Sequence, residues 1–155
     1  MLETVVSTRG DNMNQATIFL PMLCQILLTL IVWIWMYVTR VRDIRNGQLD
    51  VQRLDTVQSA ARVLTHTTPA ENFSNLFELP VLFYCACLTL YALKLVNTDY
   101  LVLAVGFVVL RVVHSLIHCS YNRVMHRFSA YLLSSLLLWA MWLMLAKDII
   151  SRIFI

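Results

Sequence analysis

Four long apolar runs constrain this chain more than any other feature. The first covers residues 18–38 without a charged residue, and the others cover about 76–96, 100–118 and 129–146. A helix needs about 20 mostly apolar residues to cross the hydrocarbon core of a bilayer. Inside hydrocarbon a helix satisfies its own backbone hydrogen bonds, and no alternating pattern of barrel strands is present. The sequence therefore predicts an all-α integral membrane protein, a bundle of four spanning helices.

The composition excludes several other classes of protein. Charged residues make up 14% of the chain, whereas soluble domains contain about 25%. The formal net charge is only +3, and no basic patch interleaved with aromatic residues is present, so we expect no nucleic-acid partner. The four cysteines occur at neither zinc-finger nor disulfide-framework spacings, which favours buried, reduced thiols. The composition indicates a lipid bilayer as the main partner.

The sequence predicts one domain preceded by a short N-terminal segment. Residues 1–12 show no periodicity, and we expect them to be a disordered segment, followed by a single membrane domain at 13–155. Residues 68–71, Thr-Pro-Ala-Glu, have the composition of a helix start, which places the beginning of the second helix before its apolar run. Pro80 lies inside that run and lacks a backbone donor, so we expect a kink there.

Basic residues near the ends of the runs predict the orientation in the membrane. Seven of them fall in the connections after the first and third runs: Arg40, Arg42, Arg45, Arg53, Arg62, Arg123 and Arg127. Four fall on the opposite side: Arg9, Lys94, Lys147 and Arg152. Cytoplasmic loops carry an excess of Lys and Arg. We therefore expect both termini outside and the arginine-rich connections in the cytoplasm.

Polar residues inside the apolar runs or just before them are the best candidates for function, since ionisable groups in a membrane helix normally face the bundle interior. They gather toward the same end of the last three runs: Asn72, Asn75 and Glu78; Arg111, His114 and His118; Arg127, Tyr131, Ser134 and Ser135. Offsets of three and four place the members of the second set on one helix face. Such a cluster suits a small, multiply charged anion that also carries an amine. If the ligand has a thiol, a nearby guanidinium at a helix start would lower its pKa from about 8.5.

Each of these residues also has a structural interpretation. Glu78 and Arg111 could form an intramembrane ion pair, and Arg123 and Arg127 could serve only as topology anchors. His114 and His118 supply two of the four ligands of a tetrahedral metal site, without a Glu between them, so no metal is expected. The alternative to an enzyme is a non-catalytic membrane protein whose polar cluster stabilises the bundle or binds a partner. A third interpretation is a bundle that binds a metal or haem through His114 and His118.

Two segments carry a resemblance to a known family. Residues 71–91, ENFSNLFELPVLFYCACLTLY, and 111–133, RVVHSLIHCSYNRVMHRFSAYLL, resemble the MAPEG family, membrane-associated proteins in eicosanoid and glutathione metabolism. The resemblance covers about residues 13–146 and is strongest with the bacterial branch. It implies a four-helix membrane bundle assembled as a trimer, with glutathione bound between neighbouring subunits on the cytosolic side. A bacterial inner membrane would be the location.

The resemblance also implies roles for individual residues. The arginine that activates the glutathione thiol falls on Arg127. The residues that would hold glutathione are Arg42 (with Arg40 as a competitor), Asn75, Glu78, Arg111, His114, His118, Arg123 and Tyr131. Ser74, His118 and Phe128 depart from the pattern of the eicosanoid enzymes. We therefore expect a membrane-bound, glutathione-dependent transferase or peroxidase that acts on small lipophilic electrophiles other than eicosanoids.

Overall fold

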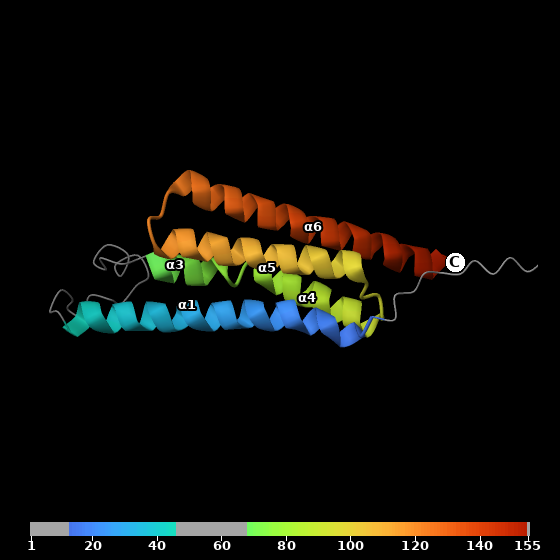
Figure 1. The fold of residues 1–155 in the computed structure, drawn as a ribbon, viewed down its shortest axis with the longest axis horizontal. Coiled ribbons are helices and arrows are strands. Elements are labelled where there is room, and N and C mark those ends of the chain that lie inside the picture. Colours follow the sequence, from blue (N-terminus) through green and yellow to red (C-terminus); the bar gives the residue numbers. More distant parts are fainter. Residues whose placement is uncertain (1–12, 46–67, 155) are drawn as a thin grey trace, which may run out of the picture.

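The computed structural model describes residues 13–45 and 68–154 (Figure 1). Its helices are η1 (Gln15–Ile18), α1 (Phe19–Arg45), α3 (Thr68–Asn75), α4 (Leu79–Ala92), α5 (Thr98–Cys119) and α6 (Val124–Phe154). Four stretches are long and apolar enough to cross a membrane: Gln15–Arg42, Ala70–Ala92, Thr98–Cys119 and Val124–Phe154. The predicted all-α architecture with four spans is confirmed, and the described residues contain no strand. Residues 1–12, Arg53 and Arg62 lie outside the described part of the chain.

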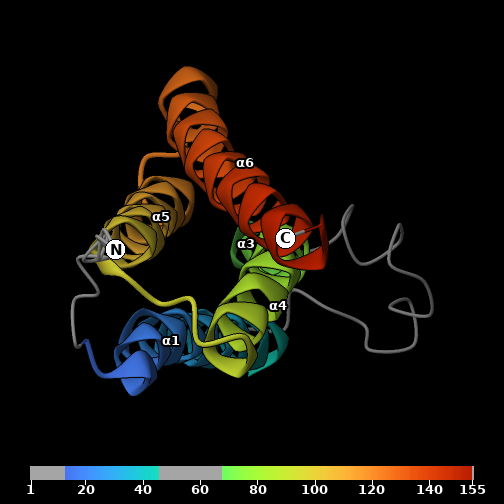
Figure 2. The same cartoon turned by 90° about the vertical axis from the view of Figure 1, so that its right-hand side faces the viewer.

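The helices run side by side along the long axis of the molecule, and Figure 2 shows them end-on. The end of α1, the start of α3 and the α5–α6 turn lie together at one end of the bundle (Figure 1). We call this the turn end; the α4–α5 turn and the C-terminus of α6 lie at the other end. Phe83 of α4 and Phe107 of α5 are fully buried and stack with ring centroids 4.6 Å apart in the core.

The second span is broken rather than only kinked. Helix α3 ends at Asn75 and α4 begins at Leu79, with Pro80 in its first turn. A proline in a continuous helix would lack its own N–H and clash with the carbonyl four residues earlier. The chain instead closes short turns, in which the amides of Leu76 and Phe77 donate to the carbonyls of Asn72 and Ser74. The break frees the backbone carbonyl of Asn75 for another donor.

Polar contacts hold the other end of the bundle together. The side chain of Gln15 both accepts from the backbone N–H of Val96, at 2.9 Å, and donates to its carbonyl, at 3.1 Å. The Tyr100 hydroxyl donates to Asp148 Oδ2 across 2.7 Å, which joins α5 to α6. These contacts fix the N-terminal turn, the α4–α5 turn and the end of α6 relative to one another.

Large apolar side chains cover much of the outer surface, as a bilayer requires; Leu143 is 72% exposed and Leu20 is 68% exposed. All four cysteines are free, but Cys24 and Cys85 are exposed, so the expectation that every thiol is buried is wrong. A thiol behaves as a small hydrophobe, and on a membrane helix it can face lipid as readily as the core.

Candidate functional site

Arg111 is the centre of a buried polar cluster at the turn end. Its side chain is 0% exposed, and its Nη2 donates to the freed backbone carbonyl of Asn75 across 2.7 Å. Its Nε and Nη1 have no hydrogen-bond partner. The guanidinium carbon lies 5.8 Å from the centroid of the Tyr131 ring, within the range of a cation–π contact. A buried charge is costly unless it is paired, so these two nitrogens are donors available to an acceptor.

The interpretation that Glu78 and Arg111 form an ion pair is wrong: the described residues contain no such pair. Glu78 is exposed and lies at the N-terminal cap position of α4, where its side chain caps no amide. Glu78 lies in the break itself, after the end of α3 at Asn75 and before the start of α4 at Leu79. The backbone carbonyl of Asn75, not a carboxylate, is the group that meets Arg111.

Two buried histidines lie beside Arg111 on α5. His114 is 2% exposed, and its Nδ1 lies 3.1 Å from the backbone oxygen of Arg127, so Nδ1 carries the proton that is donated. Its Nε2 is then an acceptor, and it has no partner. His118 is 1% exposed, and its Nε2 lies 3.1 Å from Arg127 Nη1, which can only donate. The Nδ1 of His118 is then a donor without a partner.

Arg127 reaches back from the first turn of α6 to the end of α5. Its Nη1 donates to Asn122 Oδ1 across 3.0 Å as well as to His118. Asn122 has a left-handed backbone with φ of 46°, a conformation that asparagine tolerates better than most residues. Both acceptors are neutral, so these contacts position the guanidinium without neutralising its charge.

Tyr131 lies one turn after Arg127 and closes the cluster. The centroid of its ring is 5.8 Å from that of His114. The hydroxyls of Ser134 and Ser135 donate to the backbone carbonyl of Tyr131, at 2.7 and 2.8 Å, so they serve α6 itself. Arg111, His114, His118, Arg127 and Tyr131 are therefore brought together, with Asn75 joined through its backbone.

The other predicted ligand residues are not part of this cluster. Arg42, near the end of α1, and Arg123, just before α6, are exposed, as is Glu78. Arg42 and Arg123 lie at the turn end, whereas Glu78 lies at the break between α3 and α4. Among the described residues, no hydrogen bond or ion pair joins these three side chains to the cluster.

Two buried amides complete the polar interior. Asn72 is 0% exposed; its Nδ2 donates to Cys119 Sγ and its Oδ1 accepts from Ser115 Oγ, each across 3.4 Å. Gln25 of α1 is also 0% exposed, and neither of its amide atoms has a partner. We did not expect a role for Gln25, although it is the only side-chain amide in the run 18–38.

The unpartnered atoms determine which ligand the cluster can accept. Arg111 offers two donors, His118 offers one, and His114 offers an acceptor. This set matches a molecule that carries a carboxylate and a protonated amine. Within residues 13–45 and 68–154, no group of three or more His, Cys, Asp or Glu side chains could hold a metal ion.

Comparisons with known proteins give one match. The family model described as MAPEG family matches residues 18–147, which is most of the chain. Comparison with curated proteins and comparison with solved structures each give no match.

Proposed function

This chain belongs to the MAPEG family, and on that premise we propose that it is a membrane-bound, glutathione-dependent transferase or peroxidase acting on lipophilic electrophiles. Membership makes it a multi-pass membrane protein of the family associated with glutathione and eicosanoid metabolism. The observation that carries the finer proposal is Arg111, a fully buried guanidinium with two unpartnered nitrogens beside two half-satisfied histidines.

Glutathione has the groups that this cluster lacks. Its carboxylates would accept from Arg111 and from His118 Nδ1, and its ammonium group would donate to His114 Nε2. Charge-assisted hydrogen bonds of this kind are about twice as strong as neutral ones. Binding would therefore remove the cost of leaving four polar atoms buried without partners.

Arg127 is the residue that we assign to catalysis. Its guanidinium is held by the neutral acceptors His118 and Asn122, so its positive charge remains available to a thiolate. It also lies in the first turn of α6, where the helix dipole favours negative charge. In the conjugation step the thiolate sulfur forms a bond to the electrophilic carbon, and the leaving group departs with the electron pair of the broken bond. Lowering the thiol pKa raises the fraction of glutathione that can react.

The exposed residues of the predicted ligand set would act in an assembly. We propose that Arg42, Glu78 and Arg123 contact glutathione bound by a neighbouring copy in a homotrimer. The site would lie on the cytoplasmic side of a bacterial inner membrane, where glutathione is available. Lipophilic electrophiles would reach it from the bilayer.

A structural role is the second candidate, and one observation favours it. Arg127 joins the end of α5 to the start of α6 through His118 and Asn122, and this contact alone would explain the position of Arg127 without any chemistry. In that case the cluster would stabilise the bundle, and glutathione would not bind.

Conjugation of glutathione to an aryl halide by purified protein separates the two candidates. Loss of one electrostatic contact to the transition state typically lowers turnover by about 10²–10³-fold, which is the effect expected for Arg127→Ala. Arg127→Lys should recover part of the rate, since it keeps the charge but not the planar fork. Lys147→Ala, an exposed cation on α6 far from the turn end, is the control and should keep the wild-type rate. Wild-type protein that neither binds glutathione nor accelerates the reaction would establish the structural role instead.

A further inference from the structure

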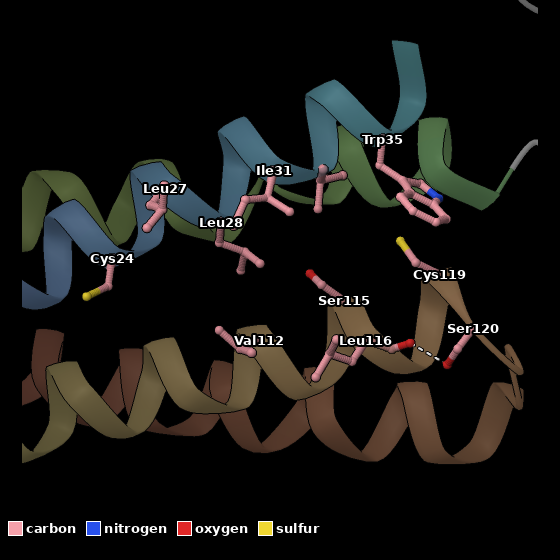
Figure 3. A pocket seen from close by; sticks show the side chains of 11 residues that line it. Cys24, Leu27, Leu28, Ile31, Trp35, Val112, Ser115, Leu116, Cys119 and Ser120 are labelled. Atoms are coloured by element: carbon pink, nitrogen blue, oxygen red, sulfur yellow. Dashed lines mark hydrogen bonds between the residues drawn. The ribbon is translucent and has the colours of Figure 1, made fainter. Parts of the chain in front are cut away.

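A long apolar groove separates α1 from α5 on the side of the bundle away from α6. Its volume is about 550 Å³, and Figure 3 shows the side chains of the two helices facing each other across it. The main lining residues are Leu28, Ile31, Trp35, Val112, Leu116 and Cys119. The hydroxyl of Ser115, which also lines it, already donates to Asn72. The groove therefore offers hydrocarbon contact rather than polar recognition.

The length of the groove along α1 matches the thickness of one leaflet. It extends along α1 from Cys24 to Trp35, and eleven residues of α-helix rise about 16 Å. The hydrocarbon core of a bilayer is about 30 Å thick, so one leaflet contributes about half of that. Trp35, Cys119 and Ser120 form the end of the groove that lies toward the turn end of the bundle (Figure 3).

Two arginines continue the groove face of α1 beyond Trp35. At 3.6 residues per turn, Arg42 lies two turns after Trp35 on the same face, and Arg45 lies almost one turn further. Both side chains are exposed, and both line a second hollow with Tyr37, Val38 and Val41. The opposite face of the helix carries Arg40. The apolar groove is therefore followed along α1 by Arg42 and Arg45, which we expect at the level of the lipid headgroups.

We propose that the groove binds one acyl chain of an anionic phospholipid from this leaflet, with the lipid phosphate at Arg42 and Arg45. The charge complementarity and the match to one leaflet select this occupant over a second copy of the chain. Arginines at a membrane surface favour anionic lipids, and each contributes about a fivefold preference. The site is separate from the cluster around Arg111.

Fluorescence quenching by brominated lipids tests the proposal. Two proteins with a single tryptophan are reconstituted in phosphatidylcholine vesicles, one keeping Trp35 and the other keeping Trp33, with the remaining tryptophans changed to Phe. Trp33 is 47% exposed and Trp35 is 53% exposed, but they point from opposite faces of α1. Phosphatidylglycerol with brominated chains should quench Trp35 more strongly than brominated phosphatidylcholine at the same mole fraction. Trp33 should be quenched equally by both lipids.

The arginines provide the matched variants. Because Arg42 is also among the residues proposed to hold glutathione, Arg45→Gln is the diagnostic change. It should lower the preference of the Trp35 site for phosphatidylglycerol about fivefold. Arg40→Gln removes the same charge from the opposite face and should leave the preference unchanged. Equal quenching of Trp35 by both lipids, equal effects of the two substitutions, or a Trp35 shielded from every brominated chain by a second copy would each overturn the proposal.

Discussion

The Nη2 atom of Arg111 donates to the backbone carbonyl oxygen of Asn75 across 2.7 Å, which joins α5 to the break in the second span. The acceptor exists because Pro80 interrupts the helix, so a proline on one span provides the partner of an arginine on the next. This contact fixes one nitrogen of the guanidinium and leaves Nε and Nη1 free. The guanidinium of Arg111 is thus held in position and still has two free donors, which is what we expect of a site that binds an anion.

A double-mutant cycle should show no strong coupling between Glu78 and Arg111. Glu78 is exposed and makes no ion pair with Arg111, so Glu78→Gln should change the free energy of unfolding by less than about 0.5 kcal/mol. The double change Glu78→Gln with Arg111→Gln should equal the sum of the single changes within about 0.5 kcal/mol. Thermal unfolding in detergent gives all three values. A coupling free energy of about 1 kcal/mol or more would show that Glu78 and Arg111 do interact directly.

Glutathione should stabilise the wild-type protein but not the variant Arg111→Met. A ligand at about 100 times its Kd adds about 2.7 kcal/mol to the free energy of unfolding. Without ligand, Arg111→Met removes a buried charge with unpartnered nitrogens, so its loss of stability should be small. Thermal unfolding with and without glutathione measures both effects, with Lys147→Met as the control that keeps the ligand response. An equal glutathione response in Arg111→Met would place the ligand elsewhere.

Asn122 should contribute to the protein in two separable ways. Its backbone has φ of 46°, which glycine adopts readily and alanine does not, so Asn122→Ala should be less stable than Asn122→Gly by about 1 kcal/mol. Both variants lose the acceptor for Arg127 Nη1, so both should lose turnover to a similar extent. Unfolding and conjugation assays compare them. Full activity in Asn122→Gly would show that Arg127 needs no support from this side chain.

The two ends of the bundle should label from opposite sides of the membrane. The end of α1 and the C-terminus of α6 lie at opposite ends of the molecule (Figure 1). In a background without native thiols, cysteines at Arg45 and Ser151 should react with membrane-impermeant reagents from the cytoplasmic and the external side, respectively. Labelling of Arg45→Cys only from outside would reverse the orientation and remove the proposed access to cytosolic glutathione.

Hydropathy predicts the four spans well, because each membrane helix must satisfy its own backbone and bury few charges. Helical spacing also places Arg111, His114 and His118 on one face of α5. The partners of these residues depend on packing between helices, which no spacing within one helix encodes. The carbonyl of Asn75 is an example, since a free backbone acceptor follows from the break at Pro80 and carries no side-chain signal. The burial of Gln25 likewise depends on the neighbours of α1.

The most direct test of the central claim is the pKa of the glutathione thiol when it is bound to the protein, measured from the ultraviolet absorbance of the thiolate over a pH titration. If Arg127 stabilises the thiolate, this pKa should lie clearly below its usual value of about 8.5 in the wild-type protein. In Arg127→Ala the pKa should return toward that value while glutathione still binds through Arg111. A bound thiol that titrates at its usual pKa in the wild-type protein, or one that is unaffected by Arg127→Ala, would contradict the proposed catalytic role.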